Sequence, residues 1–169
     1  MEGGFTEWKS PFEQFTGHVA TGWSPLIKAF SPPAAPRFNE NKFPPNIQSG
    51  QRSQEISFDF RSGEMGLWRT IDVIAGHQYT IEAWAKHAPS ASGLNLFLGI
   101  DLTGGGQFEA VSTTWYPWQN AGPDQWLSTR YTVRATTTRM TIFMRAVHPV
   151  AEQGGNTMFD NVSVVDEGG

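Results

Sequence analysis

Apolar and polar residues alternate along most of the chain, and this period of two restricts the fold more than any other feature. It runs through segments 56–60, 71–73, 79–85, 94–100, 131–133, 140–144 and 162–164. Successive side chains of a strand point to opposite faces, so the alternation predicts β-strands with one buried face. No window carries the apolar stripe of period 3.6 that an amphipathic helix requires.

Turn sequences separate these segments. They are rich in glycine, proline and asparagine, which supply turn conformations, and they lie near residues 75–77, 92–93, 104–106, 121–124 and 154–156. Short strands joined by regular turns over about 115 residues are typical of two packed antiparallel sheets. The sequence therefore predicts an all-β fold, a two-sheet antiparallel β-sandwich.

Residues 1–50 differ from the rest, because they hold seven prolines and five glycines. Proline has no N–H for a sheet, so we expect only short strands there, such as 18–20 or 26–29. We expect a long, ordered, ligand-facing loop segment, because its phenylalanines need burial: Phe30, Phe38 and Phe43. The whole chain, 1–169, is then a single domain with a loop-rich part (1–50) and the main strands (51–169).

The composition excludes several functional classes. The chain has no cysteine, which rules out disulfides, cysteine-based metal sites and thiol catalysis. Its net charge of −4 does not supply the basic surface of a nucleic-acid-binding protein. No stretch approaches the ~18 apolar residues of a membrane span. The first ten residues lack the basic and apolar regions of a signal peptide.

Seven tryptophans in a chain with only 17% charged residues suggest that some rings are displayed to a ligand. In segment 79–86, Trp84 alternates with the apolar residues and therefore lies on the same face of the strand as Glu82 and Lys86. That face combines an aromatic ring, a hydrogen-bond acceptor and a hydrogen-bond donor. Trp68 also lies opposite the apolar parity of its segment. Sugars offer C–H faces that pack on rings and hydroxyls that need polar partners. In the alternative interpretation, the N-terminal segment covers Trp84.

Three further rings cluster in residues 114–120, a polar, proline-containing stretch that we expect to be a loop. Trp115, Tyr116 and Trp118 together predict a ligand-binding surface, and packing on the sandwich is the alternative. We assign Trp126 to packing at the edge of the core. Two rings fit either role: Trp8 and Trp23.

Short motifs follow one another along nearly the whole chain. They are EGGF (2–5), VATGWSP (19–25), SGQRSQEI (49–56), GLWRTIDV (66–73), GHQYT (76–80), AWAK (83–86), GIDLTGG (99–105) and MFDNVSV (158–164). Their order resembles that of jelly-roll carbohydrate-binding modules of families 4, 9, 16 and 22, especially uncharacterised bacterial relatives. The resemblance implies a jelly-roll, galactose-binding-like sandwich. Arg69 stands where that group usually has glutamine, and Leu102 replaces a proline.

Residues and resemblance together point to a non-catalytic carbohydrate-binding module. We expect it to hold a neutral polysaccharide or oligosaccharide by aromatic stacking and side-chain hydrogen bonds. The candidate stacking rings are Trp68, Trp84, Trp115 and Trp118. The candidate hydrogen-bonding side chains are Glu82, Lys86, Asp101 and Arg145.

The resemblance also implies a structural Ca²⁺ where the first and last strands meet, with Glu2 and Asp160 among its ligands. In the alternative, Glu2 is a solvated terminal residue and Asp160 hydrogen-bonds a turn. The family context implies a location outside the cell or at its surface. It also implies a place in a larger glycoside hydrolase or cell-surface polypeptide. No nucleic-acid partner and no membrane span are expected.

Two other functions are compatible with the sequence. One is a structural or adhesion module that binds protein through segments 30–48 and 114–120, since tyrosine and tryptophan are also enriched at protein interfaces. The other is a jelly-roll glycoside hydrolase or lyase. A hydrolase needs two carboxylates about 5–9.5 Å apart, and the candidate pairs are Glu82 with Asp101 and Glu55 with Asp59.

Overall fold

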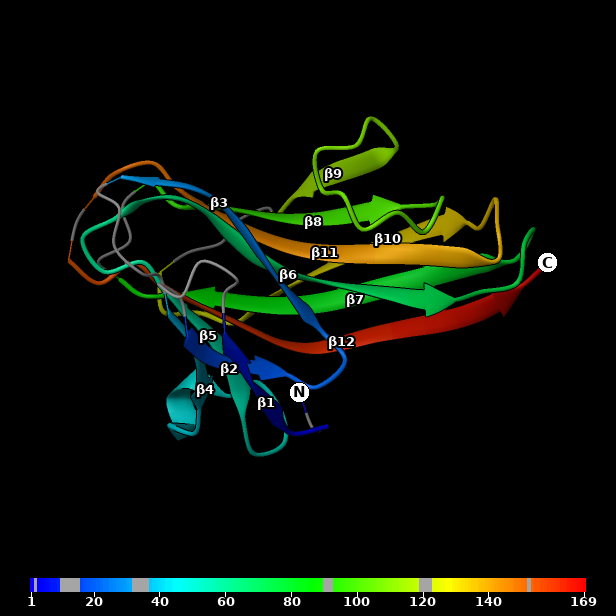
Figure 1. Ribbon diagram of the computed structural model, residues 1–169. Helices are drawn as coiled ribbons and strands as arrows, with labels where there is room; N and C mark the ends of the chain where they lie inside the picture. The colour runs from blue at the N-terminus through cyan, green and yellow to red at the C-terminus, as the bar shows by residue number, and fades with distance from the viewer. Residues whose placement is uncertain (2, 10–15, 32–36, 90–92, 119–122, 152) are drawn as a thin grey trace.

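The protein is a β-sandwich of two sheets, seen nearly edge-on in Figure 1. The computed structural model describes residues 1, 3–9, 16–31, 37–89, 93–118, 123–151 and 153–169. The strands are β1 (Phe5–Lys9), β2 (Thr16–Ala20), β3 (Ser24–Ser31), β4 (Arg37–Asn41), β5 (Ser53–Ser57), β6 (Ser62–Asp72), β7 (Gln78–His87), β8 (Asn95–Asp101), β9 (Thr113–Pro117), β10 (Leu127–Arg134), β11 (Arg139–His148) and β12 (Asn156–Gly168). A single 3₁₀ turn, η1 (Pro44–Asn46), precedes β5. Within the described ranges, no helix is long and apolar enough to cross a membrane.

The seven-stranded sheet has the order β1-β2-β4-β5-β12-β7-β10, and the five-stranded sheet has the order β3-β6-β11-β8-β9. Neighbouring strands run antiparallel except β2 and β4, which pair in parallel. The predicted all-β sandwich with antiparallel sheets is therefore confirmed.

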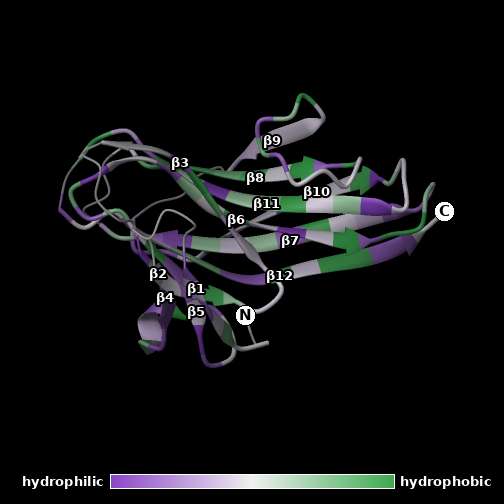
Figure 2. Cartoon of the chain, viewed as in Figure 1, coloured by the Kyte–Doolittle hydropathy of each residue, from purple (hydrophilic) through white to green (hydrophobic). Residues whose placement is uncertain are grey.

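The core lies between the sheets and comes from the apolar parity of the strands. Leu67, Leu98 and Ile142 of the five-stranded sheet pack in one cluster with Ile81 and Phe159 of the seven-stranded sheet, and all are buried. Burial stabilises each such side chain by about 1.5–3 kcal/mol. Figure 2 shows the hydrophobic residues recurring along β8, β10 and β11. The alternate residues of each strand point outward, so their side chains are available to form a binding site.

The first 50 residues contain more strand than expected. Both short strands expected there lie within β2 and β3, but β1 and β4 were not expected. Pro25 lies in β3, an edge strand, which is where sheets tolerate proline. Gly17 lets β2 approach β4, because a Cβ there would lie 2.2 Å from the carbonyl oxygen of Phe38. Four strands therefore lie in this segment, more than its prolines and glycines led us to expect.

Two phenylalanines that were expected to be buried are exposed. Phe43 is 62% exposed and Phe60 is 56% exposed. β5 ends at Ser57, and Asp59 and Phe60 have φ values of 32° and 59°. This left-handed backbone breaks the alternation and turns the ring of Phe60 outward. Phe38, in β4, is fully buried as expected.

Candidate functional site

A row of aromatic side chains crosses the outer face of the five-stranded sheet. Trp68 of β6 pairs with Phe143 of β11, which pairs with Gly99 of β8, which in turn pairs with Trp115 of β9. We call the three aromatic residues of this line, Trp68, Phe143 and Trp115, the aromatic row. The ring of Phe143 lies 6.4 Å from that of Trp68 and 5.7 Å from that of Trp115, measured between centroids. Phe143 is buried and both tryptophans are half-buried, so two partly open rings flank a buried one.

Gly99 makes room for Trp115. A Cβ at this position would lie 2.6 Å from atom Cζ3 of the indole. The ring therefore lies across β8 in the place that a side chain at position 99 would take. An indole held against a sheet in this way presents its other side outward.

Charged side chains lie beside the row. The guanidinium carbon of Arg145 is 4.9 Å from the ring centroid of Trp115 and 5.4 Å from that of Phe97. Arg145 also forms an ion pair with Glu64. A guanidinium this close to aromatic rings is attracted to them, and it still has N–H donors for other partners.

Lys28 of β3 extends this charged group. Its Nζ lies 2.8 Å from Glu109 and 3.6 Å from Glu64. The hydrogen bond to Glu109, and then the charge of Glu64, raise the pKa of Lys28 above its ordinary value. A cavity of about 230 Å³ adjoins these residues, lined by Lys28, Ser62, Gly63, Glu64, Val147, His148 and Pro149.

The loop between β8 and β9 crosses the same face. A Cβ at Gly106 would lie 2.9 Å from the ring of Trp68, so the loop backbone touches that indole. Asp101 anchors the loop, because its carboxylate accepts hydrogen bonds from Thr103 N–H (2.8 Å), the Thr103 hydroxyl (2.7 Å) and the Ser112 hydroxyl (3.1 Å). Asp101 is fully buried. Its oxygens are engaged within the loop, so we leave it out of the ligand-contacting set.

Three other candidate residues lie on the outer face of the other sheet. Glu82, Trp84 and Lys86 share one face of β7, as their parity predicted. Lys86 is buried, and its Nζ contacts Asp124 at 2.6 Å and donates to the carbonyl of Pro45 at 2.8 Å. The sandwich separates this face from the aromatic row, so one sugar ring cannot contact both.

Trp118 belongs to the core. It is 5% exposed, its ring lies 6.0 Å from that of Phe159, and its indole N–H donates to the carbonyl of Leu127 at 3.0 Å. The expected loop begins with strand β9, which turns Trp115 outward and Tyr116 inward. Tyr116 stacks on Tyr131 with centroids 3.9 Å apart. We therefore take only Trp115 of this cluster as a stacking ring.

The described residues do not assemble a calcium site. Asp160 is buried, and its two oxygens face the α-ammonium of Met1 (2.5 Å) and the backbone N–H groups of Asn161 (2.8 Å), Gln48 (3.1 Å) and Ser49 (3.2 Å). Four N–H donors occupy the oxygens that a cation would need. The ranges that are described contain no group of three or more His, Asp or Glu side chains placed to hold a metal. Glu2 lies outside those ranges, and calcium remains a prediction of the resemblance.

Of the carboxylate pairs considered for a hydrolase, one is divided between the sheets, and in the other Glu55 is engaged by neighbouring amides. Glu82 and Asp101 belong to different sheets. Glu55 accepts hydrogen bonds from the side-chain amides of Asn39, at 3.2 Å, and Asn41.

Several residues in the row or beside it were not among the site residues predicted from the sequence. Phe143 and Phe97 share the outward parity of Arg145 and Asp101, so strand parity was a usable signal for both. Nothing in the sequence indicates that Lys28, Glu64 and Glu109 meet, because they come from three separate segments.

Comparison with family models and with curated proteins found no match. Among solved structures, the chain is similar to TmCBM61 in complex with β-1,4-galactotriose, with 16% identity, 87% of this chain and 90% of that one covered, and a TM-score of 0.63. It is also similar to the C-terminal family 22 carbohydrate-binding module of Clostridium thermocellum Xyn10B, with 14% identity, 98% and 96% covered, and a TM-score of 0.58.

A third similar structure is the enzymatically active domain of bacteriophage CBA120 tailspike protein 4, with 15% identity and a TM-score of 0.60. That match covers 86% of this chain and only 19% of the phage protein. At these identities the comparisons show a common fold: the chain has the β-sandwich of carbohydrate-binding modules, which also occurs within a larger phage protein.

Proposed function

We propose that the protein is a non-catalytic carbohydrate-binding module that holds a glycan chain along the aromatic row. The observation that carries the proposal is the pair of half-buried indoles, Trp68 and Trp115, flanking Phe143 on one outward sheet face. The shared fold supports it, since one similar structure is a module in complex with β-1,4-galactotriose.

Each group has a distinct role in this proposal. The indoles of Trp115 and Trp68 stack on the C–H faces of sugar rings, which adds specific geometry to apolar burial. Arg145 and Glu64, held beside Trp115, exchange hydrogen bonds with sugar hydroxyls. The loop between β8 and β9, anchored by Asp101, borders the row at Trp68.

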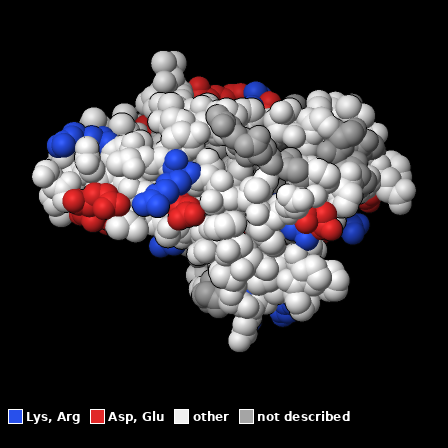
Figure 3. All heavy atoms as spheres, turned by 180° about the vertical axis from the view of Figure 1, so that it is seen from behind, with Lys and Arg blue, Asp and Glu red and all other residues white. Residues whose placement is uncertain are grey.

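The charges favour a neutral glycan. Arg145 is paired with Glu64, and Lys28 with Glu109, so the group beside the row carries no net charge. Figure 3 shows the charged side chains on one face of the molecule as small separate groups within a largely uncharged surface. We further propose a location outside the cell or at its surface, and a role as the binding part of a larger carbohydrate-active or cell-surface polypeptide.

Calorimetric titration tests this function. The chain is titrated with oligosaccharides of xylan, β-glucan, mannan, cellulose and β-1,4-galactan. We expect at least one to bind, and Trp115→Ala to weaken that ligand at least tenfold, about 1.4 kcal/mol, because the outward indole is lost.

Trp84→Ala is the matched control. It removes another half-buried indole, from the opposite sheet, and should leave the affinity unchanged. The proposal would be contradicted if no oligosaccharide of the panel bound, or if both variants lost the same amount of affinity.

A further inference from the structure

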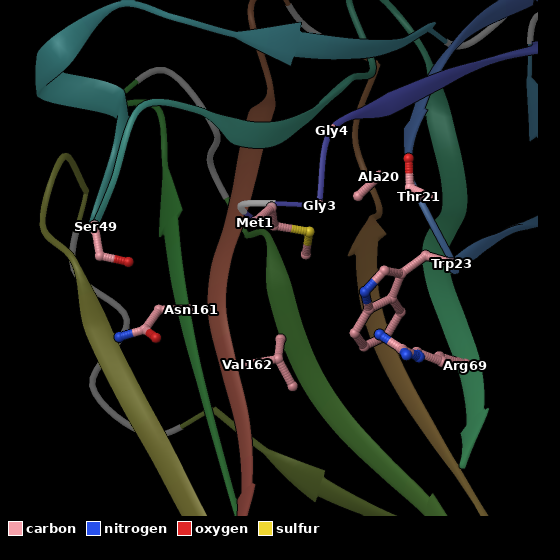
Figure 4. Close-up of a pocket in the computed structure, with 10 residues that line it drawn as sticks. All are labelled: Met1, Gly3, Gly4, Ala20, Thr21, Trp23, Ser49, Arg69, Asn161 and Val162. Atoms are coloured by element: carbon pink, nitrogen blue, oxygen red, sulfur yellow. The ribbon is translucent and has the colours of Figure 1, made fainter.

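A second hollow lies on the other side of β6 from Trp68. It has a volume of about 310 Å³ and opens where the N-terminal strands of the seven-stranded sheet meet β6 (Figure 4). Arg69 directly follows Trp68, so its side chain points to the opposite side of the strand. The hollow is therefore distinct from the aromatic row.

Arg69 is unusual for its position. It has the inward parity of Leu67 and Ile71, which pack in or against the core. The sandwich opens at this point, and Arg69 is exposed in the hollow rather than buried. Within the part of the chain that the structure describes, no carboxylate forms an ion pair with it and no acceptor receives its N–H groups. Among the described residues the guanidinium is thus available to an anionic ligand, which it would hold by charge-assisted hydrogen bonds.

The rest of the lining suits a sugar. The indole of Trp23 and the side chain of Arg69 both line the hollow, and Figure 4 shows them on one side of it, with Ser49 and Asn161 on the other. The hydroxyl of Ser49 and the amide of Asn161 make no hydrogen bonds to other described side chains or backbone groups. Val162 adds an apolar contact between the two walls.

Two residues with left-handed backbone border the hollow. Gly22 has a φ of +83°, and a Cβ there would lie 3.5 Å from the guanidinium carbon of Arg69. Asn161 has a φ of 45° and lies in the irregular stretch of β12 between Asp160 and Ser163. This irregularity turns the Asn161 side chain out of the regular alternation and toward the hollow.

We propose that this hollow binds an acidic sugar, a uronate residue. Arg69 meets the carboxylate through two parallel N–H donors, the geometry that favours arginine over lysine at carboxylates. Trp23 stacks on the ring, and Ser49 and Asn161 hydrogen-bond hydroxyls. A uronate combines all the groups that this lining can satisfy, whereas a neutral sugar leaves the guanidinium unmatched.

The test is an NMR titration of the 169-residue chain with glucuronate and galacturonate. Shifts of the Arg69 Nε–H and Trp23 indole N–H signals report the site. We expect saturable binding of at least one uronate, at least tenfold weaker binding in Arg69→Gln, and a partial loss in Arg69→Lys. Arg130→Gln, which removes an exposed arginine from the other sheet, should leave binding unchanged.

Two further ligands separate the parts of the proposal. Glucose and acetate should each bind at least tenfold more weakly than the uronate, because each lacks one half of the recognised chemistry. Acetate binding as strongly as uronate, or Arg69→Gln binding like the parent protein, would overturn the proposal. Circular dichroism and thermal melting of Arg69→Gln establish that the variant is folded.

The outcome is independent of the neutral-glycan function. Trp115→Ala should keep uronate binding, and Arg69→Gln should keep binding to the neutral oligosaccharide. Failure at one site therefore leaves the other result interpretable.

Discussion

Two glycines of the five-stranded sheet differ in what their missing side chain makes room for. At one position it is an aromatic ring of the proposed binding site, and at the other it is the neighbouring strand. A Cβ at Gly99 would meet the indole of Trp115, which belongs to a side chain and not to the backbone. A Cβ at Gly66 would lie 1.9 Å from the carbonyl oxygen of Met144, within the backbone of the neighbouring strand. The first clash can be relieved by moving a ring, and the second only by moving a strand.

Alanine substitutions at these two positions should therefore separate binding from stability. Gly99→Ala should displace Trp115 and weaken glycan binding at least tenfold, with a small change in unfolding free energy. Gly66→Ala should destabilise the fold by about 1–3 kcal/mol, the usual range for overpacking. Gly3→Ala serves as the control, because a Cβ there has nothing within 4 Å. Denaturant unfolding and titration calorimetry measure both effects, and unchanged binding in Gly99→Ala would exclude the placement argued for Trp115.

At the scale of elements, the end of β12 is tied to β7 through one carboxylate. Asp166 accepts a hydrogen bond from the backbone N–H of Gly168 at 2.8 Å and contacts His77 Nδ1 and the Tyr79 hydroxyl, both at 3.0 Å. The N–H of Gly168 first, and then His77 and Tyr79, lower the pKa of Asp166 below its ordinary value. These donors favour the charged form in the folded protein.

This lowered pKa predicts in which direction the stability of the protein changes with pH. The contribution of Asp166 to stability is complete above the ordinary aspartate pKa of about 4. It is lost as the pH falls through the lower pKa of the folded state. Asp166→Asn should melt a few degrees below the parent at pH 7, and the two melting curves should converge toward pH 2. Asp72→Asn is the control, because it makes the same change of charge at another exposed aspartate. If the difference in melting temperature between Asp166→Asn and the parent persisted or grew on acidification, the role given to Asp166 would be refuted.

At the scale of the whole molecule, the two sheets present separate outer surfaces. One displays the aromatic row, and the other displays Trp84 between its cross-strand neighbours Ser128 and Asp160. One core joins the sheets, since buried residues of both form a single cluster.

A single shared core should give a single cooperative transition. We expect calorimetric and van't Hoff enthalpies of unfolding to agree, and far-UV circular dichroism and tryptophan fluorescence to report the same midpoint. Separate transitions for the two probes would show that the N-terminal strands unfold independently. Trp84→Ala and Trp115→Ala, on opposite faces, should change stability additively.

Much of the outward surface could be predicted from strand parity. Trp68, Trp84 and Arg145 lie on the outward faces that alternation assigns to them. Strand alternation mispredicted the burial of Phe60, because the backbone leaves the regular strand there. It gave no prediction for Trp118, because β9, the strand that precedes this residue, was not recognised in the sequence.

The sequence alone determined the fold class and the face that each strand residue takes, because side-chain direction within a strand depends only on local alternation. Only the tertiary structure decided which faces coincide. Trp68 and Trp115 share a surface, and Trp84 does not, because sheet order is set by hydrogen bonds between segments far apart in the chain. The same long-range packing leaves the sandwich open beside β6. Arg69, which alternation directs inward, therefore lines a cavity there.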